Sequence, residues 1–367
     1  MDKGIEEQLE KELEKQQDEA QYKRPNILIC GYTGTGKSSL IKAILGDIVP
    51  DDAIGHGKPT TMGFDCFENK LIQIWDSRGM ELGETEEAFV GEVRRFVRER
   101  QEDKNVDNHI HLIWYAISGV NKITACDINL IKHVFNQKDV IVVITKTDIT
   151  RELAKHELKQ RLLDAGIAED RIVFTSDTEG GSIGCKELMK LSYKMLPGAY
   201  KDAFMEAQRI DIEAKVEAIK EKRAKAAGII VGATTAAAAT GAIPIPVSDA
   251  PLLITEQTAL IASLAGLYRL VNDALKKAYL PMVAKSVGMM TATSLSKLIP
   301  GLGSAISATV AGTLTCAMGW YVQREFEKIA IAKARGEILP EPNFSFDDFC
   351  KFFKGKEFEK MKDASEK

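Results

Sequence analysis

One short stretch of the chain combines residue types and a spacing that suit phosphate binding. Residues 31–38 read G-Y-T-G-T-G-K-S and fit the pattern G-x-x-x-x-G-K-[S/T]. Glycines at these positions let the backbone curl until several N–H groups face one point, and the N-terminus of a following helix adds its positive end there. Lys37 can then place its charge on the β- and γ-phosphates of a nucleotide, and the hydroxyl of Ser38 can ligate Mg²⁺.

The loop stands between the two elements that such a pattern needs. An apolar run over residues 26–30 predicts a buried strand before it, and residues 37–45 have the periodicity of an amphipathic helix after it. A glycine-rich turn that matches the pattern by chance is the alternative, but chance would not supply both flanks. We therefore interpret residues 31–38 as a phosphate-binding loop.

Bulk properties narrow the classes of function. The 367 residues suffice for two domains, and a net charge of −4 gives no general affinity for polyanions, which argues against nucleic acid as a partner. The six cysteines are dispersed without a C-x-x-C pair, so a zinc site or a disulfide framework is not expected and a reducing cytosol fits best. Residues 1–24 are mostly charged and do not resemble a secretory signal. Their thin apolar stripe of Ile5, Leu9 and Leu13 suits either a partner or light packing on the segment's own domain.

From residue 25 to residue 197, apolar runs alternate with helical patterns. The apolar runs lie at 26–30, 71–75, 110–117, 139–145 and 171–175. The helical patterns lie at 37–45, 84–101, 123–135, 151–165 and 184–196. This alternation predicts an α/β fold with a mostly parallel sheet and helices on both faces. Residues 64–67 alternate in polarity and predict an antiparallel edge strand beside residues 71–75.

Three stretches at the ends of these strands carry polar groups that a guanine nucleotide could use. In D-S-R-G at residues 76–79, Asp76 can hold Mg²⁺ through water and the N–H of Gly79 can meet a γ-phosphate. In T-K-T-D at residues 145–148, the carboxylate of Asp148 can accept two hydrogen bonds from guanine that adenine cannot supply. Residues 171–177 give a strand and a polar turn that could close over the base.

These motifs, in this order, resemble the five G-motifs of small GTPases, and over residues 25–197 the chain is similar to the Era-like group of bacterial GTPases. The resemblance implies a P-loop NTPase G domain that binds GTP or GDP with Mg²⁺ and hydrolyses GTP to GDP and phosphate. That group has two threonines before its second strand, here Thr60 and Thr61, and Thr61 is the implied switch ligand with Thr60 as the alternative. The implied catalytic residues are Lys37, Thr61 and Gly79, and the implied metal ligands are Ser38, Thr61 and Asp76. The implied nucleotide-binding residues are Gly31, Thr33, Gly34, Thr35, Gly36, Lys37, Ser38, Ser39, Asp76, Gly79, Thr145, Lys146, Asp148, Thr175 and Ser176.

Two positions depart from the pattern of that group. Thr145 stands where the group usually has Asn, but its hydroxyl can still brace the phosphate loop, so we expect only a modest loss of nucleotide affinity. Met80 follows D-x-x-G, where Ras-like enzymes place a Gln that orients water, and a thioether cannot do this. We therefore expect slow intrinsic hydrolysis, accelerated by potassium, a partner or self-association. Arg78 and Glu81 are either helpers or solvated switch residues.

After residue 197 the composition changes and predicts an all-α domain. Residues 198–225 form a charged connector helix, and residues 226–335 are rich in small residues, with uncharged runs at 226–248 and 298–323. In the second run a bulky ridge (Leu302, Ile306, Val310, Leu314) lies beside a small ridge (Gly303, Ser307, Ala311, Thr315), which lets two helices approach closely in a membrane or in a soluble hairpin. Residues 336–367 form a charged tail with several phenylalanines, expected to dock on the chain itself or on a partner.

Residues 226–335 resemble the helical domain of YcjF-type bacterial proteins, which is often fused to Era-like GTPases and often suspected of membrane association. The chain's own composition leaves three alternatives: a soluble helical domain, conditional or peripheral membrane association, and a constitutive span. Ala, Gly and Thr contribute little insertion free energy, and Pro and Gly interrupt both runs, which weighs against the span.

Together these observations predict a GTP-hydrolysing switch whose nucleotide state controls how the helical domain at residues 226–335 faces a membrane or a protein partner. We expect a cytoplasmic protein, with peripheral membrane association and a nucleotide-dependent dimer as further possibilities. One alternative is a membrane-remodelling GTPase of the dynamin-like or immunity-related kind. Another is a ribosome-assembly GTPase, which the acidic balance and the lack of a basic RNA-binding domain disfavour.

Overall fold

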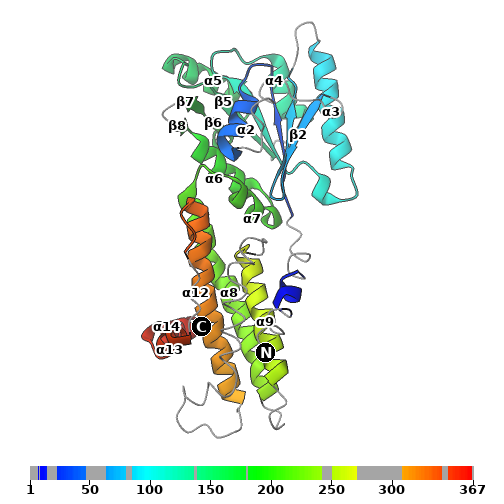
Figure 1. Cartoon of the computed structure of the whole chain (residues 1–367). Coiled ribbons are helices and arrows are strands. Elements are labelled where there is room, and N and C mark those ends of the chain that lie inside the picture. The colour runs from blue at the N-terminus through cyan, green and yellow to red at the C-terminus, as the bar shows by residue number, and fades with distance from the viewer. Residues whose placement is uncertain are drawn as a thin grey trace. The chain divides into compact units, whose positions relative to one another are not determined.

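The computed structural model describes residues 7, 9–14, 23–46, 63–79, 85–135, 139–178, 181–241, 250–270, 308–340 and 346–365 (Figure 1). The chain divides into two compact units. The first, here named the sheet unit, is Tyr22–Ala214. The second, the helical unit, combines Met1–Gln21 with Lys215–Lys367.

Six strands form the core of the sheet unit, in the order β2-β3-β1-β4-β5-β6. The parallel strands are β1 (Asn26–Cys30), β3 (Gln73–Ser77), β4 (Leu112–Ser118), β5 (Val140–Thr145) and β6 (Ile172–Phe174). β2 (Phe64–Glu68) pairs antiparallel with β3, which confirms the predicted edge strand. Every residue of β1, β4 and β5 is buried, as expected for apolar strands that are covered on both faces.

Helices cover both faces of the sheet (Figure 1). On one face Leu28, Tyr115 and Val142 pack against helices α3, α4 and α5. On the other face Ile27, Trp114 and Ile141 pack against helices α2, α6 and α7. The bounds are α2 (Lys37–Leu45), α3 (Glu86–Gln101), α4 (Ala125–Asn129, continued by a π-helical turn Leu130–Val134), α5 (Glu152–Asp164), α6 (Cys185–Met195) and α7 (Gly198–Ala207). The predicted fold class is thereby confirmed.

Smaller elements complete the sheet unit and lie around the strand ends. Two 3₁₀ turns, η2 (Val106–Asn108) and η5 (Glu169–Arg171), precede β4 and β6, and a short hairpin of β7 (Ser176–Thr178) and β8 (Gly181–Ile183) follows β6. Because five strands are parallel, the loops after β1, β3, β5 and β6 leave the same edge of the sheet. The phosphate loop, D-S-R-G, T-K-T-D and the polar turn at residues 175–177 each follow, or lie at the end of, one of these strands.

The sheet unit extends past the boundary expected at residue 197. Phe204 of α7 is fully buried and belongs to the same apolar cluster as Leu40 and Ile44 of α2. The connection after α7 is also fixed, because the side chain of Gln208 accepts hydrogen bonds from the N–H groups of Ile210 and Asp211, both at 2.8 Å. Residues 198–214 therefore pack with the sheet, and the division between the units falls at Ala214.

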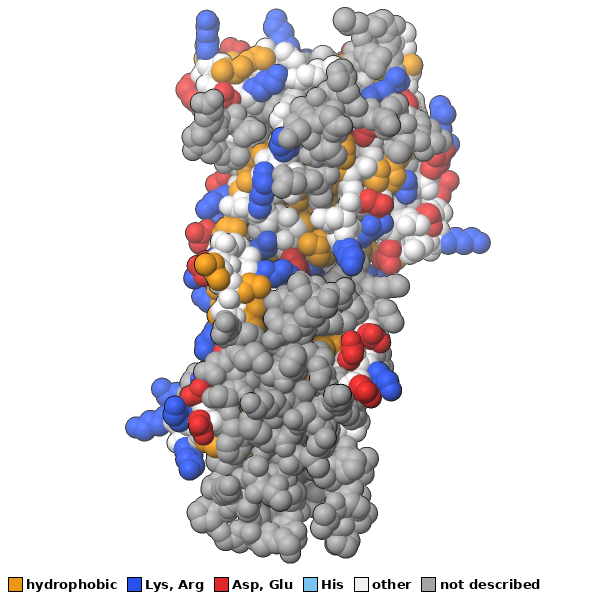
Figure 2. All heavy atoms as spheres, in the orientation of Figure 1, with side chains coloured by type: hydrophobic (Ala, Val, Ile, Leu, Met, Phe, Trp, Pro, Cys, Tyr) orange, Lys and Arg blue, Asp and Glu red, His pale blue; other side chains and the backbone are white. Residues whose placement is uncertain are grey.

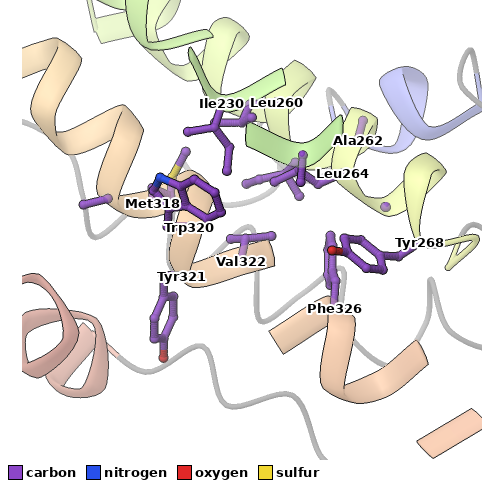
Figure 3. Close-up of a cluster of buried hydrophobic side chains, with 14 of the residues drawn as sticks. Ile230, Leu260, Ala262, Leu264, Tyr268, Met318, Trp320, Tyr321, Val322 and Phe326 are labelled. Atoms are coloured by element: carbon purple, nitrogen blue, oxygen red, sulfur yellow. The ribbon is translucent and has the colours of Figure 1, made fainter. Parts of the chain in front are cut away.

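The helical unit is built from long helices around one apolar cluster (Figure 3). Its helices are α8 (which begins at Ile212 and ends at Gly241), α9 (Ala250–Leu267), α12 (Ala308–Arg335), α13 (Phe346–Phe353) and α14 (Lys356–Ser365). Ile230, Leu260 and Phe326 meet in the cluster, one each from α8, α9 and α12. Leu9 and Leu13 of the charged N-terminal helix are fully buried in it, whereas Ile5 lies outside the described residues.

The aromatic tail docks on α12. The rings of Phe349 and Phe352 lie 5.7 Å and 5.6 Å from that of Tyr321, and Phe358 packs behind them. Small residues bring α8 and α12 together, because a Cβ on Gly319 would lie 2.8 Å from Ile230. The two ridges lie outside the described side chains except for Leu314 and Thr315, which are buried. Among the helices that the structure describes, none is long and apolar enough to cross a bilayer.

Candidate nucleotide-binding site

The loop between β1 and α2 has the backbone that its glycines predict. Gly34 and Gly36 have left-handed φ angles of 76° and 84°, a region that favours glycine, and Gly36 stands at the N-cap position of α2. Both the N–H and the hydroxyl of Thr35 donate to the carbonyl of Tyr32, at 3.3 Å and 2.9 Å, and this closes the turn. The first N–H groups of α2 have no partner within the helix, so this terminus suits an anion.

The ammonium group of Lys37 lies against the loop that precedes it. Its Nζ donates to the carbonyls of Gly31 and Tyr32 at 3.1 Å and 3.2 Å, and the residue is buried. Burial lowers the pKa of Lys37, and the nearby carboxylate of Asp76 opposes that shift. The structure therefore places a cation at the centre of the loop, where a triphosphate would meet it.

A hydroxyl and a carboxylate form a second polar pair beside this lysine. Ser38 donates from Oγ to Oδ2 of Asp76 at 2.8 Å. Burial raises the pKa of Asp76 to about 6, with Lys37 and Ser38 opposing the shift. Within the described part of the chain, Oδ1 of Asp76 is buried and has no hydrogen-bond partner. Paired oxygen donors with one oxygen unpartnered fit Mg²⁺, which favours carboxylate, hydroxyl and water ligands.

The glycine of D-S-R-G packs directly against the phosphate loop. Gly79 has a φ of 82°, and a Cβ there would lie 2.6 Å from the backbone nitrogen of Thr33. Its neighbour Arg78 instead forms an ion pair with Glu92 of α3 at 2.8 Å. The expected switch ligand (Thr61, with Thr60 as the alternative) and the residues after D-x-x-G (Met80 and Glu81) lie outside the described residues.

T-K-T-D contacts the phosphate loop through two side chains. The hydroxyl of Thr145 donates to the carbonyl of Thr35 at 2.5 Å, which is the contact by which a threonine could brace the loop. The Nζ of Lys146 donates to the carbonyl of Gly34 at 2.6 Å. These two hydrogen bonds join the phosphate loop to a segment that lies 110 or more residues away in the chain.

A cavity of about 200 Å³ lies at this junction. Its walls include Gly36, Ser39, Lys146, Asp148, Thr175 and Ser176. Residues from three separate motifs therefore surround one space, with the carboxylate-bearing Asp148 exposed at its rim. The arrangement suits a base held between Lys146 and the turn after β6, and a triphosphate that extends along the loop towards Lys37 and Ser38.

Sequence reasoning missed a polar network that joins the phosphate loop to two helices. The hydroxyl of Tyr32 lies 3.0 Å from Oγ1 of Thr124, the N-cap of α4, and 3.3 Å from Oε1 of Glu86 in the first turn of α3. Asp127 completes a capping box with Thr124 and accepts a hydrogen bond from buried Tyr115 at 2.7 Å. The T-x-x-D spacing of the capping box was the available signal, but its link to Tyr32 is a tertiary contact.

A comparison with known families finds a match within the sheet unit. Residues 26–146 match the family described as 50S ribosome-binding GTPase. The match runs from β1 through Thr145 and Lys146, so it covers the phosphate loop, D-S-R-G and the start of T-K-T-D. It supports GTP binding and GTP hydrolysis by the sheet unit. No curated protein matches the chain.

Proposed function

We propose that this chain is a Mg²⁺-dependent, Era-like GTPase whose nucleotide state controls its helical unit. The observation that carries the proposal is the single cavity where the phosphate loop meets Lys146, Asp148 and the turn after β6. The backbone N–H groups of the loop and Lys37 bind the phosphates, and Asp148 selects guanine. Ser38 and Asp76, the latter through water, hold Mg²⁺, with Thr61 as the proposed switch ligand. Held by these residues, Mg²⁺ would supply positive charge that offsets the negative charge of the phosphates during hydrolysis.

Calorimetry on the full chain tests nucleotide selection. GTP and GDP should bind in the presence of Mg²⁺, and ATP should bind far more weakly. Lys37→Ala should abolish binding, and Asp148→Asn should shift the preference towards xanthine nucleotides, because Asn offers xanthine the donor that its O2 requires. A preference for ATP over GTP, or no retention of either, would overturn the proposal.

Hydrolysis is expected to be slow without an activator. The thioether of Met80 cannot orient water, and Arg78 is paired with Glu92. Phosphate release should therefore rise with potassium, with protein concentration or with a partner. A protein that binds GTP but releases no phosphate under any of these conditions would contradict the hydrolase assignment.

The switch role is supported by a contact, within the sheet unit, between the phosphate-loop helix α2 and the segment that precedes α8. Arg209 donates from its backbone N–H to the carbonyl of Ile44 at 3.0 Å and from Nη2 to that of Lys42 at 2.9 Å, so it caps the C-terminus of α2. Two residues further on, Asp211 accepts at 3.1 Å from the N–H of Ala214 in the first turn of α8. A shift of α2 on nucleotide exchange would thus move Arg209, which lies three residues before the first residue of α8.

Hydrogen exchange tests this route. In the full chain, exchanging GDP for a non-hydrolysable GTP analogue should change the protection of residues 212–241. Arg209→Ala should remove that change while leaving GDP affinity within about threefold of wild type. Lys186→Ala is the matched control, because it breaks an exposed ion pair with Glu213 in the first turn of α8. This variant should keep the nucleotide-dependent change in hydrogen exchange. An intact response in Arg209→Ala would refute the route.

We further propose that the helical unit meets a membrane surface or a protein effector. One face of α8 supports this, because Gly228, Val231, Gly232 and Thr235 are exposed and carry no charge. Flotation with anionic liposomes separates the readings. Nucleotide-dependent flotation would favour peripheral association or membrane remodelling, and absence of flotation in both nucleotide states would leave a cytoplasmic regulator that acts on a protein.

Ribosome binding is named in the description of the matched family, but it is not the reading that we favour for this chain. On the face seen in Figure 2, Lys and Arg side chains alternate with Asp and Glu side chains over the described part of the sheet unit. RNA-binding surfaces instead gather cations on one side. Salt-dependent co-sedimentation with 50S subunits would reverse this preference.

A further inference from the structure

The turn that carries Asp148 begins at a residue with a strained backbone. Lys146 has a φ of 56°, and it is one of two non-glycine residues with left-handed φ in the described part of the chain. L-residues adopt this region rarely and keep it only when surrounding contacts hold it. The conformation matters because it sets the direction of the chain through Thr147 and Asp148, and hence where the carboxylate of Asp148 lies.

Backbone contacts hold the two sides of this turn. The N–H of Gly119 donates to the carbonyl of Thr145 at 2.8 Å, and the N–H of Thr147 donates to that of Thr175 at 3.2 Å. The N–H of Ile149 reaches the carbonyl of Lys146 at 3.3 Å, a long hydrogen bond. These bonds alone leave the carbonyl of the strained residue weakly held.

A side chain outside the T-K-T-D motif supplies the stronger bond. The hydroxyl of Thr150 donates to the carbonyl of Lys146 at 2.7 Å, and Thr150 is 7% exposed. This hydroxyl packs closely against Gly119 in the loop after β4. A Cβ on Gly119 would lie 2.3 Å from Oγ1 of Thr150 and 3.0 Å from the carbonyl oxygen of Thr145. A glycine at residue 119 is therefore needed for the hydroxyl to stay where it is.

We propose that Thr150 is a positioning residue for base selection: its hydroxyl fixes the left-handed turn at Lys146 and thereby aims the carboxylate of Asp148. This inference rests on the proposed recognition of guanine by Asp148. Two parallel hydrogen bonds to one base edge demand a fixed carboxylate direction, since hydrogen bonds weaken steeply with misalignment. Loss of the Thr150 hydrogen bond should therefore weaken the binding of a base that donates two hydrogen bonds to Asp148 more than the binding of a base that donates only one.

The test compares GTP with inosine triphosphate, which keeps N1–H but lacks the 2-amino group. Thr150→Val keeps the side-chain shape and removes the donor. It should weaken GTP binding by about fivefold to tenfold and lower the ratio of the ITP to GTP dissociation constants by about threefold or more. Thr150→Ser retains the hydroxyl and should restore most of the ratio.

Thr234→Val is the matched control. The hydroxyl of Thr234 also donates at 2.7 Å to the carbonyl four residues earlier, but in α8. Thr234→Val should leave the ITP to GTP ratio unchanged. Gly119→Ala is a second, independent variant, because it displaces the Thr150 hydroxyl without removing it. Like Thr150→Val, it should lower the ratio of the ITP to GTP dissociation constants. It also serves as the test if Thr150→Val does not fold.

The outcomes separate the inference from the function on which it rests. If wild type does not prefer GTP to ATP, the proposed function fails. If wild type prefers GTP, but folded Thr150→Val or Gly119→Ala keeps the wild-type ITP to GTP ratio, the positioning role is wrong. A fall of the ratio in both variants, with recovery in Thr150→Ser, is the expected result.

Discussion

Replacing Gly79 by alanine should impair hydrolysis while leaving GDP binding almost intact. Gly79 has a φ of 82°, where alanine costs about 1–2 kcal/mol. The added Cβ would also lie 2.6 Å from the backbone nitrogen of Thr33, and real Cβ atoms essentially never approach closer than 3.0 Å. The steric clash with Thr33 is relieved by moving Gly79 away from the phosphate loop.

The size of the effect follows from that movement. The backbone must withdraw by at least the difference between 2.6 Å and 3.0 Å, and by up to about 1 Å for an ordinary contact. The N–H of Gly79 would then leave the position where we expect it to meet the γ-phosphate. Since a misplacement of about 1 Å can cost about 100-fold in rate, we expect single-turnover GTP hydrolysis to fall about 10-fold to 100-fold. GDP lacks the γ-phosphate, so its affinity should stay within about threefold.

Gly91→Ala provides the control for this experiment. Gly91 lies on the exposed side of α3, and nothing lies within 4 Å of a Cβ at that position. In a helix interior this change stabilises by up to about 1 kcal/mol, and it should leave hydrolysis unchanged. Phosphate release in a single turnover, together with titration of a fluorescent GDP analogue, measures both quantities. A Gly79→Ala protein that hydrolyses GTP within threefold of wild type would refute the reasoning.

Three further outcomes are expected. Burial raises the pKa of Asp76 from 3.8 to about 6, so between these pH values the folded state binds more protons than the unfolded state, and the charged carboxylate costs stability at higher pH. Asp76→Asn should therefore raise the unfolding temperature at pH 8, and this gain should shrink as the pH falls from 6 towards 4. The same variant should abolish the effect of Mg²⁺ on GTP affinity. Burial lowers the pKa of His111 below 6.5, and its Nδ1 accepts a hydrogen bond from the N–H of Asn26 at 2.9 Å. The stability that neutral His111 contributes above pH 6.5 should therefore be lost as the pH falls. His111→Gln should flatten this part of a plot of unfolding free energy against pH. Tyr32→Phe removes the hydroxyl that lies 3.0 Å from Oγ1 of Thr124, and it should lower the free energy of unfolding, measured by urea titration, by about 1 kcal/mol. It should also make GDP release a few times faster in stopped-flow measurements. An unchanged release rate would argue that this network is purely structural.

Most of the sheet unit could be predicted from local sequence patterns. The run before the phosphate loop became β1 with the expected bounds, and the helix expected at residues 37–45 is α2. The observed bounds of other elements differ from the predicted ones by about two residues; for example, the strand predicted at residues 71–75 is β3 at Gln73–Ser77. Such patterns succeed because a buried parallel strand has to be apolar along its whole length, and because a phosphate loop requires glycine at fixed positions.

Contacts between distant segments could not be predicted in this way. The ring of His111 lies against that of Tyr200 in α7, with centroids 3.9 Å apart and a tilt of 36° between the ring planes. Tyr200 also donates to Asp107 at 2.8 Å. These contacts help to explain why residues 198–214 belong with the sheet. The apolar run at residues 110–117 predicts a strand there, but it does not identify Tyr200 as a neighbour of His111. Single-sequence periodicity reports which face of an element is buried and does not report which other element buries it.

The most consequential of these long-range contacts concerns α2, because this helix has a functional group at each end. Its N-terminus carries Lys37 and Ser38, and its final carbonyls bind Arg209. Nine helical residues rise about 13 Å, so the two ends of α2 lie this far apart on one continuous helix. The helix dipole favours an anion at the first end and a cation at the second, so the electrostatics of phosphate binding and of the Arg209 cap act on the same element. The motif alone identifies the first end; the second depends on a residue more than 160 positions away, which only the fold brings to the helix. This arrangement is why we place the coupling between nucleotide and helical unit at Arg209, and why we expect its loss to uncouple the units without releasing the nucleotide.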